Sequence, residues 1–211
     1  REILGFSCAD SETEAGWTTF FRELKGRGLS QVDMVISDSH KGLVKAVKQC
    51  FQGAAWQRCQ THFSRNMLDV CPKKLHPEMK AALKSLYEAG DYETAVLLRD
   101  NILLRFQQEA PKAAALLEES FEDVMAVLAL PFAMRRRLRT TNGIERLNEE
   151  IRRRERVIRI FPNEESLSRL IGALLMEIND GWQSGKVYLD LTAYLTQQLQ
   201  VDKPTAKKSV A

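Results

Sequence analysis

The feature that most constrains the fold is a change of pattern near residue 75. Before it, short apolar segments rich in β-branched residues alternate with amphipathic helical segments. The predicted strands cover residues 2–9, 32–37 and 54–60, and the predicted helices cover residues 11–24 and 40–51, with another beginning near Thr61 or His62. This strand–helix alternation favours parallel neighbouring strands joined by helical crossovers, which is an α/β fold.

From residue 77 to residue 130 the pattern is helical throughout. Three apolar stripes at helical spacing are separated by turn signals at Gly90-Asp91 and Ala110-Pro111, and they predict about three helices. Two more helices are expected over residues 144–156 and 164–179. We therefore predict an α/β unit in two parts, residues 1–74 and 132–182, interrupted by a helical insertion over residues 75–131. A C-terminal helix and a disordered tail follow over residues 183–211, the disorder being expected from residue 203 onward.

Composition excludes several classes of protein. In 211 residues, 44% are hydrophobic and 28% are charged, which fits a globular chain and not a disordered one. No apolar run approaches the roughly 18 residues that a membrane span requires. The four cysteines are expected to be reduced thiols, as in a cytosol, because no secretory signal is present. The chain begins with Arg1 instead of Met, so we interpret it as a fragment whose natural N-terminal part is missing.

Positive charge is concentrated in one stretch. Residues 135–159 contain ten arginines and four glutamates, whereas the rest of the chain has 21 basic and 24 acidic residues. All ten cations are arginines, which suits bidentate contacts with phosphate. Charge alone leaves two interpretations open, a surface that binds nucleic acid and a solvated helix face with internal Glu–Arg pairs.

Two acidic residues are candidates for chemistry. Asp38 follows an apolar strand and precedes a helix, at the kind of sheet edge where ligands bind in α/β proteins. Glu145 lies between two groups of arginines, where a carboxylate can hold a metal ion against a phosphodiester. Each has a structural alternative. Asp38 can be a helix N-cap, and Asn142 with Glu145 fits a capping box.

Cys59 and His62 have the spacing of a metal-ligand pair. A second such pair is absent from the sequence, so packing or support of a neighbouring site is favoured over a zinc site. His40 follows Asp38 by two residues and can orient a carboxylate or contact phosphate.

Five stretches, in this order, together resemble the Mutator-type (DDE) transposase family of bacterial insertion sequences. They are REILGF (residues 1–6), VISDSHKGL (35–43), WQRCQTHFSRN (56–66), TTNGIERLNEEIRRR (140–154) and IFPNEESLSRL (160–170). The resemblance extends over about residues 1–182. Each stretch is weak alone, but five in order with a helical insertion between the third and fourth are specific.

The resemblance implies a ribonuclease H-like core, in which a mixed sheet is flanked by helices and three acidic residues meet. It matches the second Asp to Asp38, the Glu to Glu145, and the family's Cys-x-x-His signature to Cys59 and His62, with Asn142 inside the Glu motif. The family's first Asp lies on a strand upstream of residues 1–6. The N-terminal strands and that Asp are therefore expected to be missing, and this piece alone is expected to be inactive.

On this interpretation the whole protein cleaves DNA and transfers strands with two Mg²⁺ or Mn²⁺ ions held by Asp38, Glu145 and the upstream Asp. One ion activates water and later a 3′-hydroxyl, and the other stabilises the leaving oxygen. The partners implied are transposon ends, target DNA and further copies of the same chain, in the bacterial cytoplasm near the nucleoid and away from membranes. The arginines expected to hold DNA phosphates are Arg135, Arg136, Arg137, Arg139, Arg146, Arg152, Arg153 and Arg154, with Arg139, Arg146 and Arg153 foremost.

Two other interpretations stay open. One is a catalytically inactive DNA-binding protein, either truncated or domesticated, which would retain DNA without divalent metal. The other is a helical protein–protein module whose arginine stretch pairs with an acidic partner, which would lack salt-sensitive DNA affinity.

Overall fold

The computed structural model describes residues 1–158, 160–185 and 187–201. Arg159 of the arginine-rich stretch and the tail predicted to be disordered lie outside the described residues. Within the described ranges the chain is mostly helical, with one small parallel sheet, which confirms the α/β class in its general form. No helix in those ranges is both long enough and apolar enough to cross a lipid bilayer.

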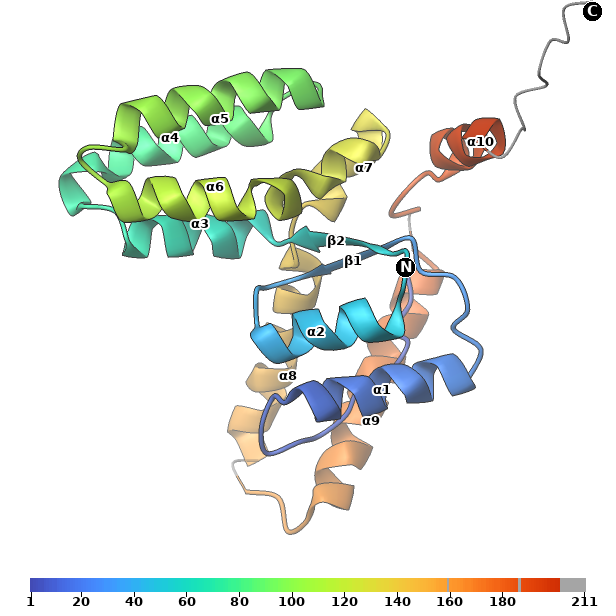
Figure 1. Cartoon of the computed structure of the whole chain (residues 1–211). Coiled ribbons are helices and arrows are strands. Elements are labelled where there is room, and N and C mark those ends of the chain that lie inside the picture. Colours follow the sequence, from blue (N-terminus) through green and yellow to red (C-terminus); the bar gives the residue numbers. More distant parts are fainter. Residues whose placement is uncertain (159, 186, 202–211) are drawn as a thin grey trace, which may run out of the picture.

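The sheet consists of β1 (Met34–Ser37) and β2 (Ala55–Arg58), which pair in parallel from Met34 opposite Ala55 to Ser37 opposite Arg58. Helix α2 (Lys41–Cys50) connects them, as the alternating pattern predicts. Helix α1 (Glu14–Gly26) packs along α2, and both helices lie on the same side of the sheet (Figure 1). A small core forms between these elements from Phe21, Ala46, Val47 and Cys50.

The first predicted strand is wrong. Residues 2–9, all of which are described, form no strand and instead run along α9 (Glu164–Gln183). The backbone N–H of Ile3 donates to Asn179 at 2.9 Å, and the thiol of Cys8 lies 3.7 Å from the hydroxyl of Ser168. A strand needs a neighbour for its ladder of hydrogen bonds, and in the described residues this segment has helices on its sides.

Four helices form a second group beside the sheet (Figure 1). They are α3 (Gln60–Asp69), α4 (His76–Tyr87), α5 (Tyr92–Phe106) and α6 (Pro111–Met125), with short 3₁₀ turns at Lys73–Leu75 and Ala126–Ala129. The three helices predicted between residues 77 and 130 are thus confirmed. Their shared core includes Met79, Leu83, Phe106, Leu117 and Phe121, and α3 adds Phe63 and Met67 to it.

Buried polar side chains of β2 join the sheet to this helical group. Gln57 is fully buried; its amide donates to the carbonyl of Val124 at 2.7 Å and its carbonyl accepts the N–H of Val127 at 2.6 Å. The guanidinium of Arg58 donates to the hydroxyl of Ser120 at 2.6 Å. These bonds fix the end of β2 against the end of α6.

The remaining helices are α7 (Phe132–Leu138), α8 (Asn142–Ile158), α9 and α10 (Thr192–Val201). Helix α9 confirms the prediction over residues 164–179 and extends it, and Asn163 caps it by accepting the N–H of Ser166 at 2.8 Å. Helix α7 was not predicted. Helix α8 leaves the sheet and α9 returns beside it, and α8 buries none of its residues, all of which are described (Figure 1).

Candidate active site

The carboxyl ends of the two strands place Asp38 and Cys59 side by side. Asp38 follows β1 and Cys59 follows β2, and the N–H of Cys59 donates to the carbonyl of Ser37 at 2.7 Å. Because paired strands lie about 4.8 Å apart, Asp38 and Cys59 are neighbours at this edge. Ligands of α/β folds bind at this edge of a sheet.

Asp38 is exposed and held by a local turn. One of its carboxylate oxygens accepts the backbone N–H of His40 at 3.1 Å. Helix α2 begins at Lys41 with His40 as its N-cap residue, so the N-cap interpretation of Asp38 is wrong. The imidazole of His40 lies 3.8 Å from the carboxylate of Glu12, and the structure thus pairs His40 with Glu12.

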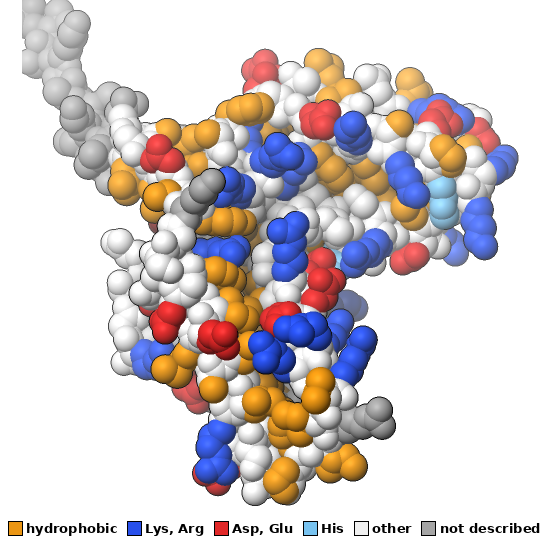
Figure 2. Space-filling view, turned by 180° about the vertical axis from the view of Figure 1, so that it is seen from behind, with side chains coloured by type: hydrophobic (Ala, Val, Ile, Leu, Met, Phe, Trp, Pro, Cys, Tyr) orange, Lys and Arg blue, Asp and Glu red, His pale blue; other side chains and the backbone are white. Residues whose placement is uncertain are grey.

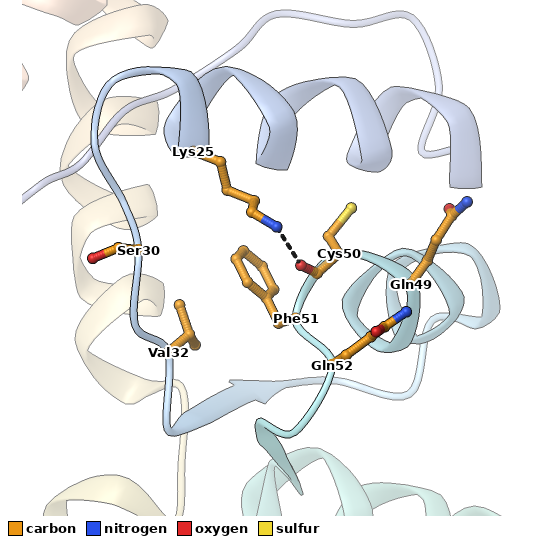
Figure 3. A pocket seen from close by; sticks show the side chains of 7 residues that line it. All are labelled: Lys25, Ser30, Val32, Gln49, Cys50, Phe51 and Gln52. Carbon is orange, nitrogen blue, oxygen red and sulfur yellow. Dashed lines mark hydrogen bonds between the residues drawn. The ribbon is translucent and has the colours of Figure 1, made fainter.

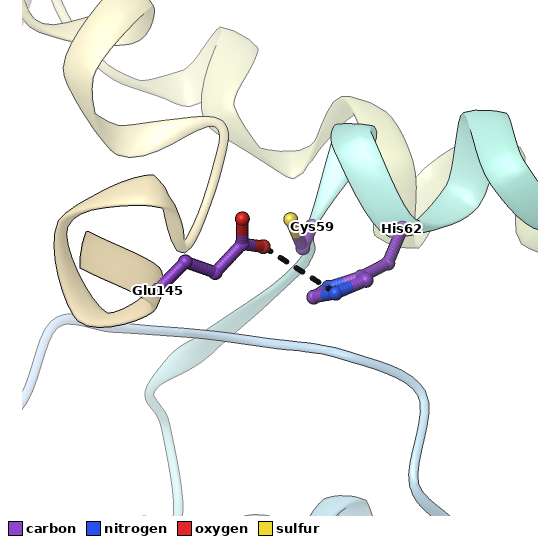
Figure 4. A group of neighbouring side chains, drawn as sticks. All are labelled: Cys59, His62 and Glu145. Carbon is purple, nitrogen blue, oxygen red and sulfur yellow. Dashed lines mark ion pairs between the residues drawn. The ribbon is translucent and has the colours of Figure 1, made fainter. Parts of the chain in front are cut away.

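Glu145 lies in the first turn of α8 and contacts a residue that follows β2. Its carboxylate lies 3.4 Å from the imidazole Nε2 of His62, as Figure 4 shows. Thr141 links this carboxylate to Cys59. The hydroxyl of Thr141 lies 3.4 Å from the carboxylate of Glu145, and both its N–H and its hydroxyl donate to the sulfur of Cys59, at 3.4 and 3.3 Å. Cys59, His62 and Glu145 therefore form one cluster.

The predicted capping box of Asn142 and Glu145 does not form, and the helix starts one residue earlier than that motif requires. Helix α8 begins at Asn142, and the N–H groups of Ile144 and Glu145 donate to the carbonyl of Thr141, at 2.9 and 3.0 Å. Thr141 is thus the residue that precedes the helix, and its own N–H and hydroxyl are bonded to Cys59. The side chain of Asn142 instead accepts the hydroxyl of Thr61 at 3.4 Å. Sequence reasoning missed Thr141, although threonine before a helix is a common cap.

The structure brings Glu145 to Cys59 and His62, with one ligand atom of each within 4.8 Å of the others. Asp38 is outside that group and lies next to it across the ladder from Cys59. Carboxylates from two separate elements at one sheet edge are a donor set that suits a hard ion such as Mg²⁺ or Mn²⁺. The chemistry of these two oxygen donors therefore agrees with such an ion.

Four arginines surround a cavity beside the start of α8. The cavity holds about 270 Å³ and is lined by Arg1, Arg136, Arg137, Thr140, Asn142, Gly143, Arg146 and Tyr188. Arg137 donates to the carbonyl of Tyr188, and its guanidinium lies 4.8 Å from that ring. Lys and Arg side chains gather over the middle of this face of the molecule in Figure 2. None of the described residues that line it is acidic, so the cavity suits an anion.

Two of the predicted phosphate contacts have internal roles. Arg135 donates to the carbonyls of Leu130 and Gly90, at 2.7 and 2.6 Å. Arg139 donates to the carbonyl of Tyr87 at 3.1 Å, while its own carbonyl accepts the N–H of Gln60 at 3.0 Å. Both arginines thus tie α7 to the helical group.

The arginines of α8 differ in the partners of their side chains. Arg153 and Arg154 pair with Glu150, and hydrogen bonds from Arg153 hold the pKa of Glu150 below its usual value. The alternative of internal Glu–Arg pairs is right for these two. Arg152 is exposed on α8, and Arg146 points to the cavity described above.

Sequence reasoning also missed Arg58. Its side chain is buried at the end of β2, where it donates to Ser120 and to Asn66, at 2.6 and 3.1 Å. Burial lowers the pKa of Arg58, while Asp123 and Glu119 act in the opposite direction. The signal in the sequence was a single arginine inside an apolar strand, because a buried arginine needs hydrogen-bond or charged partners.

A second cavity, of about 340 Å³, lies at the opposite edge of the sheet. Its lining comes from the end of α1, the end of α2 and the segment before β1, and Lys25 donates to the carbonyl of Cys50 at 3.0 Å across it (Figure 3). Val32 and Gln52 place it near the amino ends of the strands. Because it contains none of the candidate residues, we assign it no role in the site.

Comparison with known proteins points to one family. The model of the family described as "Transposase, Mutator family" matches residues 1–185. The chain is 44% identical over 193 residues to the transposase for insertion sequence element IS256 in transposon Tn4001 of Staphylococcus aureus, covering 90% of this chain and 49% of that protein. It is 42% identical over 191 residues to the transposase for IS1081 of Mycobacterium tuberculosis, covering 90% of this chain and 46% of that protein. The chain therefore spans about half the length of these relatives.

Proposed function

This chain belongs to the Mutator family of transposases, and from this premise we propose that it forms part of the catalytic core of a metal-dependent DDE enzyme. In the whole protein, that core cleaves and joins the DNA of an insertion sequence. The observation that carries the proposal is the meeting of α8 with the strand ends. Glu145 contacts His62, which follows β2, and β2 is paired with β1, the strand that Asp38 follows.

A ribonuclease H-like architecture agrees with this arrangement. The β1–α2–β2 unit has an acidic residue after its first strand, and a helical group separates it from the helix with the second acidic residue. Residues 2–9 form no helix and no strand, and they have no strand partner among the described residues. We propose that further strands of the longer protein pair with this segment and supply the first Asp.

Asp38 and Glu145 are the proposed ligands of Mg²⁺ or Mn²⁺. When bound, these ions activate a nucleophile and stabilise the leaving oxygen of a phosphodiester. His62 and Thr141 orient the carboxylate of Glu145 through their contacts with it. Arg136 and Arg146 hold backbone phosphates in the cavity at the start of α8, where helix N–H groups also favour an anion.

The test uses the full-length transposase with Asp38→Asn or Glu145→Gln. Each change keeps the size of the side chain and removes its charge, so binding of transposon ends in a gel-shift assay should be nearly unchanged while Mg²⁺-dependent cleavage is lost. The matched control is Glu155→Gln, an exposed position further along α8. Cleavage that survives either substitution removes that residue from the site, and loss of cleavage in the control points to a general charge effect.

A further inference from the structure

We propose that Cys59, His62 and Glu145 form a binding site for Zn²⁺ that differs in chemistry from the Mg²⁺ or Mn²⁺ site. Zinc bound there would take Glu145 away from the catalytic ion and inhibit cleavage; this consequence rests on the function proposed above. The site itself rests only on the geometry of the three side chains.

The donor set and its spacing fit zinc. The cluster offers one sulfur, one nitrogen and one oxygen, and these atoms all lie within 4.8 Å of one another. The imidazole Nε2 and the carboxylate oxygen are 3.4 Å apart. Two ligands at Zn–N and Zn–O distances of about 2.0 Å in tetrahedral geometry are separated by roughly 3.3 Å. The two side chains thus stand almost as they would around a shared ion, and Figure 4 shows them facing the same space as Cys59.

The surrounding structure holds the ligands in place before any metal arrives. Cys59 is fully buried, and its sulfur is fixed by the two hydrogen bonds from Thr141. Cys59 is the N-cap residue of α3 and His62 lies in the first turn of that helix, so the start of α3 positions both side chains. The second ring nitrogen of His62 is buried without a hydrogen-bond partner in the described part of the chain, and the first nitrogen, Nε2, is the one that faces the carboxylate of Glu145.

The site is open on one side. The side chains of His62 and Glu145 are 31% and 32% exposed, whereas Cys59 is enclosed. Three protein ligands with an open position are typical of catalytic zinc sites, while four ligands are typical of structural ones. The sequence alone disfavoured zinc because it contains a single Cys-x-x-His pair. The third ligand comes from α8, which only the fold brings near.

The sulfur distinguishes this site from a magnesium site. Thiolate ligands select soft ions such as Zn²⁺ and are poor ligands for Mg²⁺, which prefers oxygen. Glu145 is a candidate ligand in both sites. Zinc and magnesium should therefore compete for one carboxylate, with Cys59 and His62 favouring zinc.

The test is titration of the metal-free full-length transposase with Co²⁺, which reports thiolate ligation as a charge-transfer band in its absorption spectrum, followed by displacement with Zn²⁺. The wild type and the control variant Cys71→Ser, in which another buried thiol is removed, should both show the band. Cys59→Ser should abolish it. His62→Gln and Glu145→Gln, at half-exposed positions where folding is less at risk, should weaken Co²⁺ binding.

Absence of the band in the wild type, or its survival in Cys59→Ser, would overturn the proposal. Unchanged Co²⁺ affinity in both His62→Gln and Glu145→Gln would overturn it as well. A second arm measures Mg²⁺-dependent cleavage with added Zn²⁺, and stronger inhibition of the wild type than of His62→Gln is expected. Cleavage without the band refutes the zinc site alone, and a band without any cleavage refutes the proposed function alone.

Discussion

Removing two arginines from the cavity at the start of α8 should weaken DNA binding and make the affinity depend less steeply on salt concentration. Among the described residues, the side chains of Arg136 and Arg146 make no hydrogen bond or ion pair, so their charges are available to a phosphate. Arg137 already donates to the carbonyl of Tyr188. Each phosphate contact adds about 0.9 to the slope of log affinity against log salt concentration. The double variant Arg136→Ala/Arg146→Ala should therefore lower that slope by about 1.8 and weaken binding about 60-fold near 0.1 M salt.

The assay is fluorescence anisotropy with a labelled transposon-end duplex and the full-length protein, repeated over a series of salt concentrations. The control removes two exposed cations outside the cavity, Arg22 on α1 and Lys112 on α6. This control should leave the slope almost unchanged. Equal slopes for the wild type and the cavity variant, or equal losses in variant and control, would refute the assignment of phosphates to this cavity.

Three further predictions concern the stability of the fold around the candidate site. Gln57→Leu leaves the buried N–H of Val127 without its partner and should cost about 2–4 kcal/mol in the free energy of unfolding, measured with urea; an unchanged midpoint would contradict this. Gly42→Ala places a Cβ 2.8 Å from the backbone N of Glu14 and should cost about 1–3 kcal/mol, whereas Gly26→Ala meets no atom within 4 Å and should be close to neutral in the same assay. Burial raises the pKa of Tyr87 to about 12 from an ordinary value of 10, so its contribution to stability is complete below pH 10 and is lost as the pH rises toward 12. Tyr87→Phe should reduce the loss of unfolding free energy between pH 10 and 12 by roughly 2 kcal/mol. Equal losses in variant and wild type over that range would show that Tyr87 is not responsible.

The parallel strand pair and the helical group were predictable because local pattern determines them. Strands β1 and β2 are short apolar runs bounded by turn signals, and the connecting α2 has one apolar face. The helices of residues 77–130 bury apolar stripes against one another, and this needs no information from the rest of the chain. Such elements follow from periodicity and punctuation.

The errors arose where distant contacts decide the local structure. Residues 2–9 have strand-like composition, but their contacts are with α1 and α9, and a strand cannot form without a neighbouring strand. The segment before α8 is held by the bond from Thr141 to Cys59, which is far away in sequence. Helix α7 begins after Pro131 and buries Met134. It was missed because its run of arginines hides the apolar positions of the helix.

In the candidate site, too, the residues could be identified from the sequence but their contacts could not. Asp38, Glu145, Cys59 and His62 were identifiable from sequence as residues of interest, partly through the resemblance to the Mutator family. That Glu145 contacts His62, and that Thr141 joins it to Cys59, required three elements to be assembled in space. No spacing rule within the sequence could supply these contacts, because α8 is separated from β2 by the whole helical group.

The central claim is that Asp38 and Glu145 share a divalent ion in the whole enzyme. Its most direct test is a crystal structure of the full-length transposase with Mn²⁺ and a transposon end, in which anomalous scattering locates the manganese. The account predicts a peak in coordination contact with the carboxylates of both residues, together with an aspartate from the upstream part of the protein. Manganese bound to neither carboxylate, or ordered crystals in which the two carboxylates bind separate and unconnected ions, would contradict it.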